Sequence, residues 1–187
     1  MPSTATPYGL IPVNHPSGTI RPTNYTITSG YATGILQNQP VKIVPSSTGE
    51  GTIAAAAVGD RFIGTFQGVQ YVDANGVLTF ANKWTASTTG TYIVAAVTLD
   101  PTIFYQIQSD DTLAVTDIGK QYDFNTASGS TTTGLSSVSL DVASVASNAS
   151  MRIIGLAPGV NNAWGDAYVD VVVQISEHQN VADIASY

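Results

Sequence analysis

The segment RFIGTFQGVQYVDANGVLTFANKW, residues 61–84, decides the fold class of this chain. Two runs of alternating residues flank the sequence DANG at 73–76, where Asn-Gly favours the positive φ angles of a tight hairpin turn. The segment therefore predicts two antiparallel strands joined by that turn. Strict alternation would place Phe66 and Val69 on opposite faces of the first strand. Both faces carry apolar groups, so neither is expected to be simply solvent-exposed.

Further strand-like runs lie on both sides of this hairpin. They are rich in Val, Ile, Thr and Tyr, which favour strands, and Gly, Asn, Asp and Ser clusters separate them. The predicted strands are residues 25–29, 41–44, 91–100, 103–108, 151–157 and 168–176. With the hairpin they make about nine strands and no helical layer. The expected fold is all-β: one antiparallel domain that is a sandwich, jelly-roll-like, or a barrel.

Two other segments leave alternatives open. The run AAAA at 54–57 is compatible with the start of a short helix, although Gly51 and Gly59 confine it. The Ser/Thr/Gly-rich stretch 125–150 fits a long mobile loop. Four apolar residues in it, Val138, Leu140, Val142 and Val145, also suffice for a strand and an ordered turn.

Composition is compatible with one domain that has one core. The chain has 187 residues, of which 43% are hydrophobic. It contains no cysteine, which excludes disulfides and thiolate metal sites. The start of the sequence lacks the basic residues and apolar block of a secretory signal, and no stretch approaches the roughly 20 apolar residues of a membrane helix. We therefore expect no contact with a membrane.

The first 24 residues are punctuated by proline. Five of the nine prolines fall there, and each removes a backbone donor and favours extended geometry before it. We therefore predict an extended N-terminal arm over residues 1–24 and a β domain over residues 25–187.

Charge is distributed unevenly along the chain. Residues 1–49 hold Arg21 and Lys42 and no acid, whereas residues 50–187 hold four basic and thirteen acidic side chains. A phosphate binder needs clustered basic residues, which are absent here. Direct nucleic-acid binding is therefore not expected.

No catalytic set stands out in the sequence. His15 lies among prolines, and His178 follows the last predicted strand, where an exposed histidine is expected. Asp110-Asp111 fits a solvated turn better than a pair of glycosidase carboxylates, and a cation site at Asp166 and Asp170 lacks the usual calcium-loop spacing. The chain is therefore predicted to be no enzyme and to need no metal or cofactor.

Four segments together resemble one known family. They are residues 61–87, 91–124, 128–141 and 151–178, and the opening PYGLIPV at 7–13 adds to the likeness. The chain resembles the head decoration, or cement, proteins of tailed bacteriophages, which are encoded beside the major capsid protein. The likeness covers nearly the whole chain, and the family brings no catalytic residues with it.

The resemblance implies a β-rich structural protein of the virion. Such a protein sits on the outer capsid surface, binds the major capsid protein and stabilises contacts between capsomers. The resemblance also implies a homo-oligomer of closed symmetry, with a trimer favoured and a dimer possible. The expected capsid or subunit contacts lie in the arm, at Tyr8, Leu10, Ile11 and Val13 as apolar anchors and at Arg21 as a charged contact.

Two other functions remain open at this point. A carbohydrate-binding or adhesin-like module would use surface aromatics, for which Trp84 and Trp164 are the candidates. A hydrolase with paired carboxylates is the third hypothesis, and the sequence favours it least.

Overall fold

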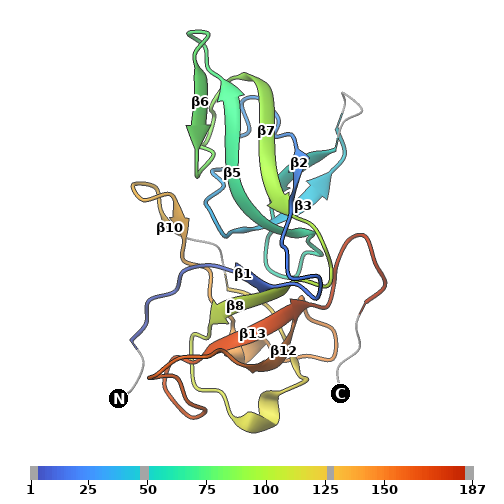
Figure 1. Ribbon diagram of the computed structural model, residues 1–187, viewed down its shortest axis with the longest axis vertical. Helices are drawn as coiled ribbons and strands as arrows, with labels where there is room; N and C mark the ends of the chain where they lie inside the picture. Colours follow the sequence, from blue (N-terminus) through green and yellow to red (C-terminus); the bar gives the residue numbers. More distant parts are fainter. Residues whose placement is uncertain (1–3, 47–50, 126–128, 184–187) are drawn as a thin grey trace.

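The computed structural model describes residues 4–46, 51–125 and 129–183 (Figure 1). The protein is all-β and its sheets are antiparallel, in line with a sandwich-like fold, as the sequence predicts. Two short 3-10 turns, Val115–Asp117 (η1) and Val142–Ser144 (η2), are the only helical elements in the described residues.

Six strands form the first of two lobes, which we call the barrel lobe (residues 22–99). They are β2 (Pro22–Tyr25), β3 (Pro40–Val44), β4 (Thr52–Ala55), β5 (Gly64–Val72), β6 (Leu78–Ala81) and β7 (Thr91–Thr98). Their order is β2-β7-β5-β3-β4, and β6 pairs with the far half of β5. A parallel bridge between Thr26 and Thr52 joins the end of β2 to β4. The strands therefore wrap around a core of their own.

The predicted hairpin of residues 61–84 is confirmed as β5 and β6. Val72 pairs with Leu78, and the Asp73 carboxylate accepts hydrogen bonds from the backbone N–H groups of Asn75 and Val77, which fix the turn. The predicted alternation is wrong in one respect, because Phe66 and Val69 lie in the same core. A β-bulge between Phe66 and Gly68 adds one residue to β5. The residues after the bulge therefore point to the opposite face from the one that strict alternation predicts.

A second sheet forms the other lobe, which we call the sheet lobe. Its strands are β1 (Ile11–Asn14), β8 (Phe104–Gln108), β9 (Gln121–Tyr122), β12 (Met151–Leu156) and β13 (Asp170–Ile175). Their order is β1-β8-β13-β12-β9. Val171, Val173 and Ile175 point into the core of this lobe, as their alternation predicts.

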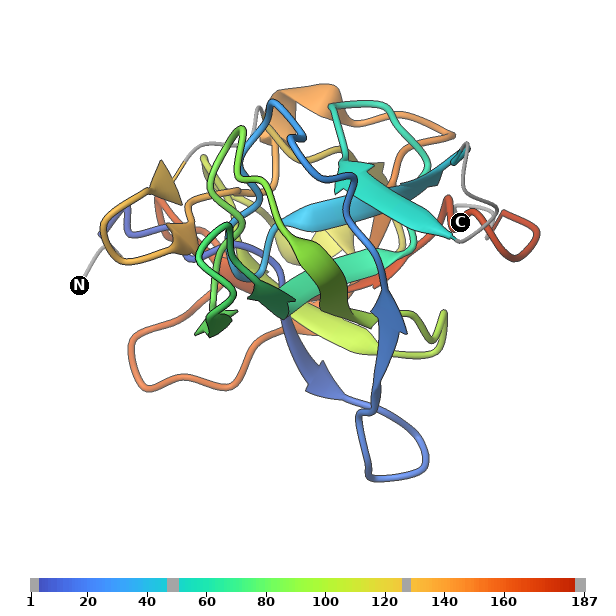
Figure 2. The ribbon, with the colours of Figure 1, turned by 90° about the horizontal axis from the view of Figure 1, so that it is seen from above.

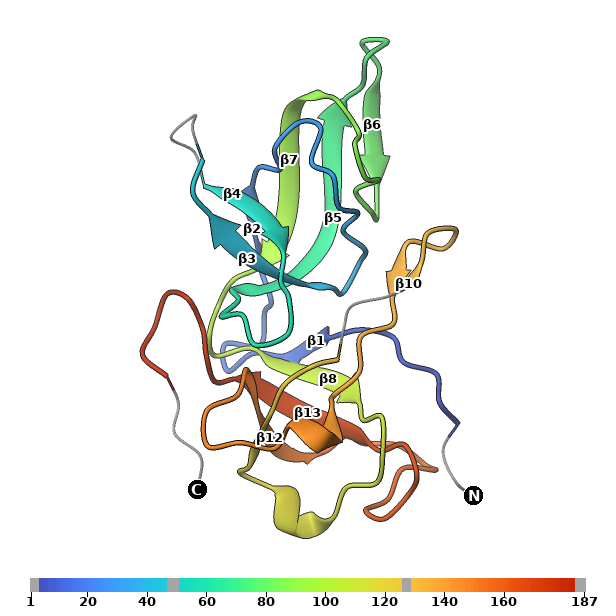
Figure 3. The ribbon, with the colours of Figure 1, turned by 180° about the vertical axis from the view of Figure 1, so that it is seen from behind.

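The chain thus has two clusters of buried apolar residues where composition predicts one. One cluster lies inside the barrel lobe and the other against the second sheet, and the two lobes stack along the long axis of the molecule (Figures 1 and 3). Phe62 links the two clusters. It belongs to the barrel-lobe segment of the chain, but its ring packs in the sheet-lobe core, edge-on against Phe124, with ring centroids 5.7 Å apart.

The Pro-rich segment is extended and belongs to both sheets. β1 pairs with β8 in the sheet lobe, and β2, which spans the predicted boundary at residue 24, pairs with β7 in the barrel lobe. Both are edge strands, where a missing proline N–H costs little, and this explains Pro12 and Pro22. The strand predicted at 25–29 therefore begins earlier than its alternation indicates and ends at Tyr25.

The two ambiguous segments are both β structure in the described residues. The first two residues of the alanine run, Ala54 and Ala55, lie in β4 and pair with β3, so the run does not start a helix. The Ser/Thr/Gly-rich stretch contains a small hairpin of β10 (Gly129–Ser130) and β11 (Leu135–Ser136), and Val138 and Leu140 after it are buried. The ordered alternative is therefore confirmed for the part of this stretch that the structure describes.

Candidate functional site

The predicted contact residues of the N-terminal segment fall into two groups. Tyr8 and Leu10 are engaged by their own chain: the Tyr8 hydroxyl donates to Asp170 Oδ1 at 2.9 Å and accepts from Gln106 Nε2 at 2.9 Å, while Leu10 is fully buried in the sheet-lobe core. Burial and the Asp170 carboxylate hold the pKa of Tyr8 well above its usual range. These two side chains anchor the segment to its own sheet. The prediction of Leu10 as a contact to another subunit is wrong, because its side chain is fully buried. Tyr8 is only half-buried, and its contact to another subunit stays a prediction.

The remaining predicted residues are more accessible. Ile11 is half-buried in β1, Val13 is 42% exposed, and Arg21 is exposed and makes no hydrogen bond or ion pair within the described residues. Val13 precedes, and Arg21 ends, the loop of residues 14–21, which we call the waist loop. It leads from β1 in the sheet lobe to β2 in the barrel lobe and projects from the body of the molecule (Figure 2).

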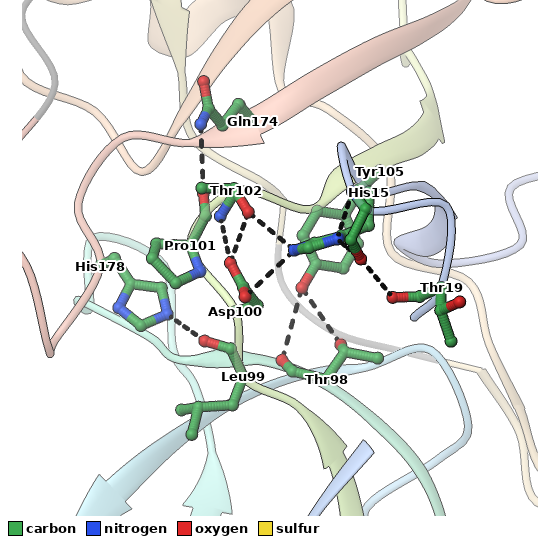
Figure 4. Close-up of polar contacts among 11 residues, drawn as sticks. His15, Thr19, Thr98, Leu99, Asp100, Pro101, Thr102, Tyr105, Gln174 and His178 are labelled. Carbon is green, nitrogen blue, oxygen red and sulfur yellow. Dashed lines mark hydrogen bonds and ion pairs between the residues drawn. The ribbon is translucent and has the colours of Figure 1, made fainter. Parts of the chain in front are cut away.

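His15 fixes the waist loop to the connection between the lobes (Figure 4). Its Nε2 lies 3.1 Å from Asp100 Oδ2 and 2.9 Å from Thr102 Oγ1. Asp100 in turn accepts from the backbone N–H and the hydroxyl of Thr102, and these hydrogen bonds lower the pKa of its carboxyl. Sequence analysis could not find this contact, because 85 residues separate the two partners.

The other ring nitrogen of His15 faces Ser17. Nδ1 lies 2.6 Å from the Ser17 hydroxyl and accepts the Ser17 backbone N–H at 3.0 Å. Ser17, His15 and Asp100 thus have the residue types of a nucleophile, a base and an orienting acid. However, the single lone pair of Nδ1 already accepts the backbone N–H, so it is not free to take a proton from the hydroxyl. The arrangement closes a turn and does not activate a nucleophile.

Two shallow pockets border this cluster and share Arg21 and Asp100. The first, about 380 Å³, is also lined by Ser17 and Thr19, and the second, about 410 Å³, by His178 and Asn180. Each pocket thus places the Arg21 guanidinium, which has no ion-pair partner in residues 4–46, 51–125 and 129–183, beside the Asp100 carboxylate and neutral polar side chains. Both pockets are therefore of mixed charge.

His178 lies inside the junction, where sequence analysis predicts an exposed side chain. It is fully buried, and its Nε2 donates to the carbonyl oxygens of Ile63 and Leu99, both at 2.9 Å (Figure 4). Nδ1 accepts the backbone N–H of Asn180 at 3.1 Å. The neutral ring satisfies all three contacts, and its burial lowers its pKa. The residue is structural, and nothing in the local sequence SEHQN indicates its burial.

A hydroxyl network completes the junction. The Tyr105 hydroxyl, from β8, lies 3.1 Å from Thr98 Oγ1 at the end of β7, and Thr98 Oγ1 lies 2.9 Å from Thr65 Oγ1 on β5. All three residues are buried. This network ties the two lobes together, and burial raises the pKa of Tyr105 far above its usual range.

The aromatic residues proposed for sugar binding are not exposed platforms. Trp84 is 1% exposed and packs edge-on against Tyr71 in the barrel core, so its prediction as a surface aromatic is wrong. Trp164 is partly buried against the sheet-lobe core. The sequence does not reveal which of the aromatic residues face solvent.

The predicted acidic pairs also have structural roles. Asp110 accepts the backbone N–H of Val142, Asp166 accepts that of Ala163, and Asp170 accepts the Tyr8 hydroxyl. Within residues 4–46, 51–125 and 129–183, no three His, Asp or Glu side chains are grouped as metal ligands. None of the helical turns in the same ranges is long and apolar enough to span a membrane.

Comparison with known proteins identifies no relative. No protein-family model, no curated protein and no solved structure matches this chain.

Proposed function

We propose that this protein is a structural virion protein that decorates the outside of a mature phage head and stabilises contacts between its capsomers. The resemblance of its sequence segments to head decoration proteins motivates this function. The observation that supports it is the waist loop, an acid-free segment that projects from the body and ends at Arg21, which has no ion-pair partner within the described residues.

The waist loop is built for binding to another protein. Val13 and Arg21 are exposed at its two ends, and the contact of His15 with Asp100 holds the start of the loop in place. A loop that is already ordered loses little conformational entropy when a partner binds it. The contact we propose is therefore apolar at Val13 and ionic at Arg21, against an acidic patch of the major capsid protein.

The charge of the two lobes suits a protein at a particle surface. Residues 22–99 carry three basic and three acidic side chains, whereas the rest of the chain carries three basic and ten acidic ones. A strongly acidic lobe keeps decorated particles soluble and repels free nucleic acid. We propose that the acidic sheet lobe faces solvent when the waist loop contacts the capsid.

Co-sedimentation with expanded capsids of the phage that encodes this chain tests the proposal. The wild-type protein is expected to pellet with expanded capsids, with binding that weakens as salt rises, because an ionic contact is screened. Arg21→Glu should reduce binding at least tenfold. Lys120→Glu is the matched control, since it reverses an exposed lysine that already pairs with Asp117, and it should bind as the wild type does.

A wild-type protein that stays in the supernatant at every salt concentration would refute the proposed function. Unchanged binding of Arg21→Glu would instead refute the waist loop as the site of contact. Light scattering of the purified protein measures the proposed homo-oligomer, for which we expect a trimer ahead of a dimer.

A further inference from the structure

The outer face of the barrel lobe carries a groove that the proposed function does not use. Four strands, β2, β7, β5 and β6, present this face side by side in Figure 1, and β3 and β4 lie behind them (Figure 3). The groove has a volume of about 500 Å³. It is a hollow in a strand surface, where backbone positions are rigid.

The strand register explains why the face is hollow. Asn24 on β2 pairs with Ala96 on β7, and Ala96 pairs with Gly68 on β5. Alanine and glycine thus form the floor between the flanking strands. A side chain at Gly68 would meet the Ala81 carbonyl at 3.2 Å, and its φ of 152° also favours glycine. The floor of the groove is therefore low because Ala96 and Gly68 have small side chains or none, and Gly68 cannot easily be replaced by a larger residue.

The next row across the same strands supplies the binding groups. Val94, Gln70 and Phe80 are paired in register across β7, β5 and β6. The Phe80 side chain is 70% exposed, a large value for an aromatic residue on a strand. Asn24 and Gln70 are exposed, and their carboxamides make no hydrogen bond within the described residues. One free aromatic ring and two free carboxamides therefore face the same groove.

We propose that this groove binds a neutral oligosaccharide. A carboxamide both donates and accepts hydrogen bonds, as a sugar hydroxyl does, and a flat ring stacks on the apolar face of a pyranose. None of the residues lining the groove is charged, so it offers no partner for a phosphate, sulfate or carboxylate. From β2 to β6 are three strand spacings of about 4.8 Å, or about 14 Å, which accommodates a short chain of sugar rings.

A glycan array probed with the full-length protein tests the groove. The array should carry neutral oligosaccharides beside sialylated and sulfated ones, and binding to neutral members is expected. The best neutral glycan is then titrated against variants. Phe80→Ala and Gln70→Ala should each weaken binding about tenfold, the loss expected for one stacking contact or one hydrogen bond. Phe80→Tyr should retain binding, because the ring remains.

Leu78→Ala is the matched control. Leu78 lies two residues before Phe80 on β6, is 55% exposed, and does not line the groove. The thermal midpoints of all four variants should match the wild type, because the altered side chains are exposed or, in Phe80→Tyr, closely similar in shape.

Three outcomes would overturn the proposal. They are the absence of binding to every neutral glycan, preferential binding to acidic glycans, and equal binding by wild type and Phe80→Ala. A protein partner is distinguished from a glycan in the same set of variants: if Phe80→Ala abolishes self-association or capsid binding while no glycan binds, the groove is a protein interface.

Discussion

Nε2 of His178 lies 2.9 Å from the carbonyl oxygen of Leu99, so a residue near one end of the described chain satisfies the backbone at the connection between β7 and β8. The same N–H also reaches Ile63, and the opposite ring nitrogen accepts the Asn180 N–H. One neutral imidazole thereby joins three separate segments at the lobe junction.

The first prediction concerns the pH dependence of stability. Burial lowers the pKa of His178 in the folded protein below its ordinary value of 6.5. The unfolded chain therefore takes up a proton below about pH 6.5 that the folded chain refuses, and stability falls as the pH drops through that value. His178→Gln should be less stable than wild type at pH 7 by about 1–3 kcal/mol, because buried carbonyls lose a donor. The difference should shrink between pH 7 and pH 5.

Urea unfolding at several pH values measures this effect. Asn180→Ala keeps both the histidine and the backbone N–H that it accepts, so its pH dependence should match that of the wild type. Parallel pH profiles for wild type and His178→Gln would show that the ring protonates as easily in the folded protein as in the unfolded one.

Gly64 is the second site of prediction. Its φ of 148° favours glycine, and a Cβ there would lie 1.5 Å from the Thr98 carbonyl oxygen. Gly64→Ala should therefore separate β5 from β7 and cost about 3 kcal/mol or more. Gly155→Ala is the control, since its Cβ would meet nothing within 4 Å. Thermal unfolding compares the two, and similar midpoints would contradict the close approach at Gly64.

The third prediction tests whether the N-terminal segment belongs to the fold. Leu10 is fully buried in the sheet-lobe core, so Leu10→Ala should cost about 2–5 kcal/mol. Val13→Ala, at the exposed end of the same strand, should change stability by less than about 0.5 kcal/mol. Chemical denaturation decides between the alternatives: an independent arm would give two near-neutral variants. For the same reason we expect truncation of residues 1–24 to unfold the protein.

The His15 contact provides a fourth prediction. His15→Ala removes the contact with Asp100 and Thr102 and should free the waist loop. Global stability should change by about 1 kcal/mol or less, because Asp100 is 48% exposed and such pairs contribute little. Amide exchange of residues 14–21 should nevertheless become faster, while exchange in β13 stays unchanged. Unaltered exchange in the loop would mean that Pro16 and the backbone hydrogen bond from Gly18 N–H to the carbonyl oxygen of residue 15 suffice to hold it.

The sequence predicts the local structure of this protein well and its long-range contacts poorly. The hairpin at 61–84 follows from alternation and an Asn-Gly turn, which are properties of neighbouring residues. The bulge at Gly68 reverses half of that alternation, and only the pairing with β7 reveals it. The two separate cores escape prediction for the same reason, because composition sums over a chain whose partners are far apart.

The candidate site shows the same division. Arg21 is found by its charge in an acid-free segment, and it is exposed as a contact residue must be. Trp84 and Leu10 have the right chemistry for binding but are buried, which no local pattern indicates. Phe80, the most exposed phenylalanine or tryptophan among the described residues, is indistinguishable in the local sequence from the buried Phe66 in the other strand of the hairpin.

The position of β13 in its sheet has a consequence for synthesis of the protein. β13 lies between β8 and β12, so the sheet lobe lacks its middle strand until residue 175 has been made. All strands of the barrel lobe are complete by residue 98. On the ribosome the barrel lobe can therefore close while the β1–β8 pair still lacks β13, the second neighbour of β8. The waist loop of the proposed capsid contact directly follows β1, so the sheet that supports this loop is completed only once β13 has been synthesised.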